Sequence, residues 1–228
     1  MRRPFSRVVF PSQHALQLGR RMGIPDKRCV LIPPGIEHHK FGPDPDRPLR
    51  SNVLFVGKFE RRKGIYDVLE TARALPDIPF RLLGWGPEEQ NLCQAAPPNV
   101  TIEIVPPGGV MDNSDTRLPE AFAGASIFFL PSRAESFGLV LVEAMASGCA
   151  IVSSVPLEFE GVRVRPGEIG SMVDAIRRLW ADPQGMARIG PRNIQRASVH
   201  NWDRFTSALV ETYEQILGRQ LCREECHA

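Results

Sequence analysis

The chain has 228 residues, a formal net charge of +2 and 43% apolar residues. A chain of this length buries a core without disulfides or metals, and so small a charge does not indicate nucleic acid as a partner. No stretch approaches the ~20 apolar residues of a membrane span. The charged N-terminus lacks the apolar segment of a secretory signal.

The cysteines and the basic N-terminal segment bear on location. Five cysteines in irregular spacing favour a reducing cytosol over a disulfide framework. The pair Cys222 and Cys226 is interpreted as part of a frayed terminus rather than as a metal site. We therefore expect a cytoplasmic protein with peripheral membrane contact at most. Basic residues crowd the start of the chain, where a solvated face and contact with an anionic membrane surface are alternative interpretations: Arg2, Arg3, Arg7, Arg20, Arg21, Lys27 and Arg28.

Short apolar runs alternate with amphipathic segments along the chain. The runs carry β-branched or aromatic residues, as strands covered on both faces do. Strand, helix, strand, helix is the order of a doubly wound, Rossmann-like parallel α/β sheet, which binds ligands beyond the carboxyl ends of its strands. The predicted strands are 7–10, 29–32, 53–56, 80–83, 100–105, 127–130 and 150–153, and the predicted helices are 64–75, 118–123, 137–147, 169–181 and 202–217.

Proline-rich breaks divide the chain. Pro33 and Pro34 end one strand–helix–strand unit, and the prolines of 43–48 indicate a linker. We therefore expect a preceding fragment in 1–35, a linker in 36–50 and a ligand-binding domain in 51–200. A last helix, 201–217, carries an apolar stripe that needs a surface to cover, and 218–228 is a tail.

The first candidate site is the segment 57–64, between a predicted strand and a predicted helix. Gly57 lets the backbone approach a ligand closely. Lys58 and Lys63 supply charge for a phosphate, and the helix start adds backbone donors. A charged surface loop is the alternative interpretation.

The second candidate site is the turn Gly84-Trp85-Gly86-Pro87, which also follows a strand. Pro87 suits the first turn of a helix. A plain tight turn is the alternative, because Glu89 stands where a dinucleotide fingerprint has its third glycine.

The third candidate site runs from Glu135 to Glu143. We expect Ser136 to cap a helix there, so that the amides of Phe137, Gly138 and Leu139 bind a diphosphate. Glu143 lies about two helical turns after Ser136 and faces the same way. Each carboxylate is suited to accept hydrogen bonds from sugar hydroxyls beside the diphosphate. The alternative is an acid placed by the helix dipole and a solvated glutamate.

These three segments, in this order, resemble the C-terminal lobe of the family-4 retaining glycosyltransferases, which have the two-lobed GT-B fold. The resemblance rests on Gly57-Lys58 with Lys63-Gly64, on Gly84 to Pro87, and on the two glutamates around Phe137-Gly138-Leu139, followed by the segment 144–148.

The resemblance implies that Lys58 and Lys63 hold the diphosphate of a nucleotide-sugar donor and that Glu135 contacts the transferred sugar. The amides of Gly138 and Leu139 would bind the diphosphate or sugar, and Glu143 the ribose. It implies transfer with retention, without a bound metal or other cofactor. The base would be read by backbone around 106–109 and the Trp85 loop.

The chain departs from the family pattern in four places, one of which is Trp85, where the family commonly has a small or acidic residue. Lysine stands at position 58, where the family usually has arginine, so bidentate phosphate contact is lost. The segment 153–164 lacks the family's glycine-rich loop. Residues 1–35 resemble only the last strand, helix and strand of the acceptor-binding N-terminal lobe.

Three functions are therefore considered. The first is the donor-binding half of an enzyme, with the other lobe supplied by a partner chain or an upstream segment. The second is a module that binds a nucleotide or nucleotide sugar without turnover, and the third is an unrelated α/β scaffold. An exposed apolar stripe at Phe205, Leu209 and Tyr213 would favour a missing partner.

Overall fold

The computed structural model describes residues 5–46, 48, 51–105 and 116–218. The chain divides into two compact units. The larger unit runs from Glu37 to Val199, and the smaller combines the residues up to Ile36 with those from His200 onward. Each is described separately.

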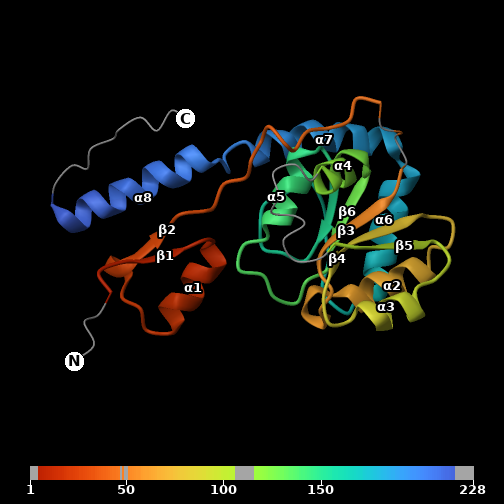
Figure 1. Ribbon diagram of the computed structural model, residues 1–228, viewed down its shortest axis with the longest axis horizontal. Coiled ribbons are helices and arrows are strands. Elements are labelled where there is room, and N and C mark those ends of the chain that lie inside the picture. Colours follow the sequence, from red (N-terminus) through yellow and green to blue (C-terminus); the bar gives the residue numbers. More distant parts are fainter. Residues whose placement is uncertain (1–4, 47, 49–50, 106–115, 219–228) are drawn as a thin grey trace. The chain divides into compact units, whose positions relative to one another are not determined.

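A six-stranded parallel sheet forms the centre of the larger unit (Figure 1). Its spatial order is β5-β4-β3-β6-β7-β8. The chain therefore winds outward from β3 in one direction, returns to the middle, and winds outward from β6 in the other. This is the order of the Rossmann fold, and the switch point lies between β3 and β6. The strands are β3 (Val53–Lys58), β4 (Phe80–Trp85), β5 (Val100–Ile104), β6 (Ile127–Leu130), β7 (Ala150–Ser153) and β8 (Gly161–Arg163).

Helices cover both faces of this sheet. On one face α2 packs against α6, and on the other α5 packs against α7 and α4 (Figure 1). Phe55, Phe128 and Phe129 are fully buried between the layers. The apolar strands form because both faces are covered. The helices are α2 (Ile65–Arg73), α3 (Glu89–Ala95), α4 (Arg117–Gly124), α5 (Leu139–Ala146), α6 (Ile169–Ala181) and α7 (Pro183–Ala197), with a 3-10 turn η2 (Arg61–Lys63) before α2.

The smaller unit is a parallel strand pair with helices. It contains β1 (Val8–Phe10), α1 (Gln13–Arg21), the 3-10 turn η1 (Asp26–Arg28), β2 (Cys29–Leu31) and α8 (Trp202–Leu217). The two strands are parallel and in register from Val8 opposite Cys29. The Ile36 N–H donates to the His200 carbonyl at 3.1 Å, which joins the two chain segments.

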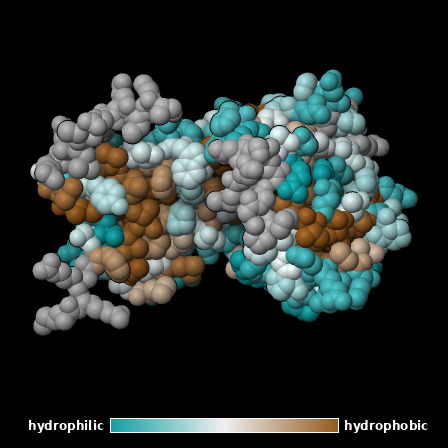
Figure 2. All heavy atoms as spheres, viewed as in Figure 1, coloured by the Kyte–Doolittle hydropathy of each residue, from teal (hydrophilic) through white to brown (hydrophobic). Residues whose placement is uncertain are grey.

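Exposed apolar side chains are concentrated on the smaller unit (Figure 2). In α8, Tyr213 is 51% exposed, while Phe205 and Leu209 are half-buried. The stripe predicted for this helix is thus only partly exposed. The unit's large exposed apolar residues are Phe5, Val9, Leu18, Met22, Leu31, Trp202, Tyr213, Ile216 and Leu217.

The α/β fold class, its parallel sheet and all seven predicted strands are confirmed, five of the strands with one end shifted. The strand β8 falls in the segment 153–164, and it was not predicted. Helix α7 was not predicted either, whereas α3 is the helix expected after the Gly84–Pro87 turn, although it begins at Glu89. The predicted linker 36–50 lies almost entirely within the larger unit, and the last helix falls in the same unit as the first 36 residues. That this smaller unit is a remnant of an acceptor lobe stays a prediction.

Among the described residues, no helix is both long enough and apolar enough to cross a bilayer. Cys29, Cys93 and Cys149 are free thiols. Cys222, Cys226, Arg2 and Arg3 lie outside the described residues.

Candidate nucleotide-sugar site

Two loops meet at the carboxyl ends of β3 and β6, on either side of the switch point. They are the β3–α2 loop (residues 59–64) and the β6–α5 loop (residues 131–138). The Arg133 N–H of the second loop donates to the Arg62 carbonyl of the first at 2.8 Å. In doubly wound sheets this crevice is where ligands bind. The fold therefore places the first and third predicted segments side by side.

Gly64 makes this close approach of the two loops possible. Its φ is 74°, in the left-handed region that favours glycine. A Cβ atom at this position would lie 2.3 Å from the Pro131 carbonyl oxygen. Any side chain at position 64 would therefore push the loops apart.

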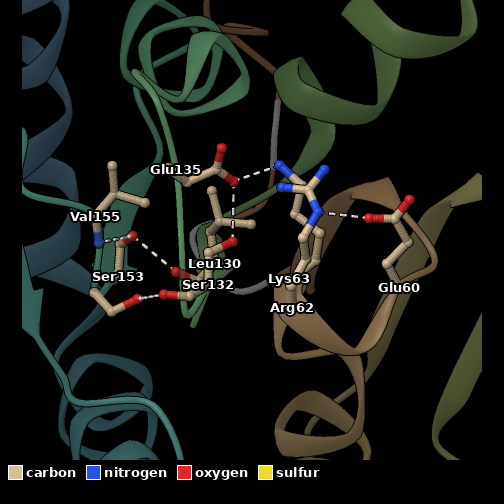
Figure 3. A network of polar contacts seen from close by, with 9 residues as sticks. Glu60, Arg62, Lys63, Leu130, Ser132, Glu135, Ser153 and Val155 are labelled. Carbon is tan, nitrogen blue, oxygen red and sulfur yellow. Dashed lines mark hydrogen bonds and ion pairs between the residues drawn. The ribbon is translucent and has the colours of Figure 1, made fainter. Parts of the chain in front are cut away.

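Lys63 and Glu135 form an ion pair that joins the two loops (Figure 3). The Lys63 Nζ lies 2.5 Å from Glu135 Oε1, and the Ser132 hydroxyl donates to the same oxygen at 3.0 Å. The Glu135 side chain is 8% exposed and the Lys63 side chain 15%. The structure thus brings together two predicted site residues, and it adds Ser132, which sequence reasoning missed.

Lys58, at the end of β3, has a different carboxylate partner. Its Nζ lies 2.5 Å from Glu60 Oε1 and 5.1 Å from the centre of the Trp85 ring. The hydrogen bond from Lys58 is the main reason that the pKa of Glu60 is lowered, and a second one comes from Arg62. The two predicted phosphate ligands are therefore each held by a carboxylate: Lys58 by Glu60, and Lys63 by Glu135.

The prediction that Ser136 caps the helix after Glu135 is wrong. Helix α5 begins at Leu139, and its N-cap is Gly138 with a φ of 95°. The Phe137 side chain is buried, and the chain turns through left-handed Gly138 before the helix starts. The first amides without a partner inside the helix are those of Leu139 and Val140, since the Leu141 N–H already donates to the Gly138 carbonyl.

Glu143 lies in α5, one turn after Leu139 and so on the same side as the helix start. Its relation to Ser136 by two turns of helix does not hold, because Ser136 precedes the helix. Its Oε2 atom is buried and has no hydrogen-bond partner among the described residues. Burial raises the pKa of the carboxyl from 4.5 to about 7. Glu143 is therefore an acid that lacks the partner expected of a buried carboxylate.

The glycines of the two strand ends pack against each other. A Cβ atom at Gly84 would lie 1.9 Å from the Gly57 carbonyl oxygen, and one at Gly86 would lie 2.6 Å from the Phe59 carbonyl oxygen. A side chain on Gly57 itself would meet only the Phe55 ring, at ordinary contact distance. Packing thus accounts for Gly84 and Gly86, and a role in ligand binding stays a prediction for Gly57 and Gly86.

The turn after β4 differs from its prediction. Helix α3 begins at Glu89, so Pro87 precedes it rather than occupying its first turn. The Glu88 carboxylate receives hydrogen bonds from Tyr66, Arg61 and Asn91, and this fastens the turn to α2. The tyrosine hydrogen bond is the largest cause of the lowered pKa of Glu88. The base-reading segment 106–109 lies outside the described residues.

Arg133 is a second residue that sequence reasoning missed. Its guanidinium lies 2.9 Å from Asp67 Oδ1 on α2, and the other oxygen of Asp67 accepts from the Gly167 N–H at 2.9 Å. Arg133 therefore holds the β6–α5 loop against α2. Nothing in the spacing signalled this pairing, because Arg133 lies in the β6–α5 loop and Asp67 on α2, far apart in the sequence. Within the described ranges, no group of three or more His, Cys, Asp or Glu side chains is arranged to hold a metal ion.

A comparison with known protein families identifies the family of this chain. Residues 50–182 match the family model described as glycosyl transferases group 1. The chain belongs to this family. The matched range contains both loops, the six strands and Glu143.

Curated relatives within the family include the D-inositol 3-phosphate glycosyltransferases of Mycobacterium bovis and Mycobacterium tuberculosis. Each is 29% identical over 240 residues, covering 92% of this chain and 48% of the relative. The chain thus spans about half the length of the curated relatives it matches.

Solved glycosyltransferase structures share the fold. Sucrose-phosphate synthase from Thermosynechococcus elongatus superimposes with a TM-score of 0.77 and 23% identity, over 92% of this chain and 58% of that one. The Anabaena protein HepE, solved in complex with UDP and glucose, gives a TM-score of 0.76 and 20% identity, over 92% of this chain and 63% of that one. At these identities the likeness establishes the fold.

Proposed function

We propose that this chain is the donor-binding half of a glycosyltransferase that transfers a sugar from a nucleotide-diphosphate-sugar to an acceptor, with retention and without a metal. The observation that carries the proposal is the Lys63–Glu135 pair across the switch point. A cation suited to a diphosphate and an anion suited to sugar hydroxyls lie together there. The UDP and glucose bound by HepE support this class of ligand.

Each predicted residue has a role in this proposal. Lys63 and Lys58 bind the diphosphate and stabilise the charge that develops on it as it leaves. The amides of Leu139 and Val140 face the same charge at the start of α5. When Lys63 moves to the phosphate, Glu135 is free to accept hydrogen bonds from the sugar.

Glu143 binds the ribose in this proposal. Its buried Oε2 has no partner among the described residues, and two neighbouring hydroxyls would supply donors to it. A buried carboxylate without a donor is costly, and a ligand that supplies donors recovers that cost.

The acceptor is a carbohydrate, lipid or small molecule, and the acceptor lobe comes from a partner chain or an upstream segment. The chain's share of about half of its curated relatives supports this part of the proposal. So do the exposed apolar side chains of the smaller unit, which suit a covering surface. We also propose a cytoplasmic location with peripheral membrane contact at most, because the irregularly spaced cysteines suit a reducing compartment.

A module that binds nucleotide sugars without turnover is the second candidate. The residues that support the first candidate, Lys63, Glu135 and Glu143, all bear on donor binding, and such binding is common to both candidates.

Calorimetric titration of UDP-sugars and GDP-sugars against the chain tests both candidates. We expect at least one to bind, and we expect Lys63→Ala and Glu143→Ala each to weaken it by roughly tenfold or more. The absence of binding by every nucleotide sugar would refute both candidates.

Donor hydrolysis separates the two. An enzyme slowly hydrolyses the bound donor, and Glu135→Ala abolishes this while donor binding persists. A module that only binds releases no free sugar from any donor, in the wild type or the variant.

A further inference from the structure

The ammonium group of Lys58 is already engaged on two sides. Glu60 Oε1 lies 2.5 Å from it, and the Trp85 ring lies beneath it at 5.1 Å. A lysine is also a point charge, without the planar fork that binds a phosphate through two parallel hydrogen bonds. Lys58, at the end of β3, therefore cannot make a two-pronged contact with a phosphate.

Arg62 lies on the other side of the same carboxylate. Its Nε is 2.6 Å from Glu60 Oε2 (Figure 3). Among the described residues, its two terminal amino groups have no hydrogen-bond or ion-pair partner. The side chain is 54% exposed. The fork of this guanidinium is thus available to a ligand while its Nε is anchored.

The backbone at position 62 is fixed at the switch point. The Arg62 carbonyl accepts from the Arg133 N–H of the β6–α5 loop at 2.8 Å. Figure 3 shows the Arg62 side chain extending, like that of Lys63, toward the side of the crevice on which Glu135 lies. Both cations are therefore presented to the same region.

We propose that Arg62 is a further binding residue for the donor's diphosphate, supplying the two-pronged contact that Lys58 cannot make. Glu60 is its positioning residue, since it holds Nε and so aims the terminal amino groups. This inference rests on the proposed donor binding and adds to it a residue from outside the predicted set.

The adjacent Arg61 provides a matched control. Its Nε is bound to Glu88 at 3.1 Å, and its guanidinium lies over the Tyr66 ring at 4.9 Å. Substitution of Arg61 removes the same unit charge from the same loop. A difference between the two arginines therefore measures contact rather than general electrostatics.

The experiment is calorimetric titration of UDP, GDP and inorganic pyrophosphate against the wild type, Arg62→Ala, Arg62→Lys and Arg61→Ala. We expect Arg62→Ala to weaken the bound diphosphates by about tenfold, the loss of a charge-assisted pair at a half-exposed site. Arg62→Lys, which keeps the charge without the fork, should lie between the wild type and Arg62→Ala. Arg61→Ala should stay within about twofold of the wild type.

A nucleoside readout separates contact from misfolding. Binding of uridine or guanosine, measured by ligand-observed NMR at millimolar concentration, should be equal in the wild type and Arg62→Ala. Glu60→Gln should weaken diphosphate binding less than Arg62→Ala does, because the guanidinium is still present but is less firmly oriented.

The failures are distinguishable. Equal effects of Arg62→Ala and Arg61→Ala, or an equal loss of nucleoside and diphosphate binding in Arg62→Ala, would overturn this inference and leave the proposed function standing. A wild-type chain that binds none of the three diphosphates would overturn both.

Discussion

Glu135 and Glu143 belong to one loop–helix segment, yet their surroundings are opposite. Glu135 has a lysine at 2.5 Å and a hydroxyl at 3.0 Å on one oxygen. Glu143 has an oxygen that is buried without a partner, and its pKa is raised to about 7. The difference teaches that two acids recognised by their spacing need not share an environment. One forms an ion pair with a lysine, whereas burial raises the pKa of the other to about 7.

The largest expected effect comes from a substitution that disrupts the contact between the two loops joined by Lys63 and Glu135. Gly64→Ala combines left-handed strain, about 1–2 kcal/mol, with a collision against the Pro131 carbonyl. We expect a loss of about 3 kcal/mol or more in the free energy of unfolding, measured by urea denaturation. Gly167→Ala is the control, because its φ is 84° and no atom lies within 4 Å of the added Cβ. Equal losses in the two variants would show that the loop contact contributes nothing.

Loss of the cation is the next most disruptive change. Lys63→Met leaves the nearly buried Glu135 carboxylate with Ser132 as its partner among the described residues, and we expect it to cost about 2–3 kcal/mol of stability. Lys58→Met should cost less than about 1 kcal/mol, because Glu60 keeps Arg62 and the Lys58 side chain is 39% exposed.

A double-mutant cycle of Lys63→Met with Glu135→Gln should return a favourable coupling of at least about 1 kcal/mol. Additive losses in that cycle would contradict the pairing.

Substitution of Glu143 should raise the free energy of unfolding, whereas the substitutions above lower it. The carboxyl is neutral in both folded and unfolded chains well below pH 4.5. As pH rises from about 4.5 to about 7, the unfolded chain releases the proton and the folded chain retains it, so stability is lost over that window. Glu143→Gln should therefore gain on the order of 2 kcal/mol at pH 8 and nothing near pH 4. Denaturation at both pH values checks the sign, and a gain that is the same at pH 4 and pH 8 would contradict it.

The smallest effect concerns ligand affinity. An ionised Glu143 accepts stronger hydrogen bonds from ribose hydroxyls than the neutral acid does. The affinity for UDP or GDP should therefore rise by roughly fivefold between pH 6 and pH 8. Because the diphosphate titrates in the same range, the Glu143→Gln variant serves as the baseline. Parallel pH profiles in the two proteins would exclude the ribose role.

Much of the fold could be predicted from the sequence because the strands are buried on both faces. Runs such as 53–56 and 127–130 are continuously apolar, and such a pattern can be recognised without knowledge of the tertiary structure. The edge strand β8 (Gly161–Arg163) was missed because it is short and largely exposed. The helix α7 was missed because Gly185, Gly190 and Pro191 weaken its pattern.

The site was predictable only in its parts. Glycines and lysines after β3 and acids after β6 follow from local spacing and from a family resemblance. The pairing of Lys63 with Glu135, the engagement of Lys58 by Glu60 and the tie from Arg133 to Asp67 depend on which loops the sheet order brings together. The start of α5 was misplaced because Ser136 is a good cap by type, whereas the backbone at Gly138 decides where the helix begins.

The hydrogen bond between Ile36 and His200 has a practical consequence. The chain leaves the smaller unit and re-enters it at neighbouring residues, so the larger unit is topologically an insertion. Such a segment, with its two ends fixed near one point, is portable. Residues 37–199 could be expressed alone, or replaced by a short glycine-rich bridge that leaves the smaller unit intact for separate study.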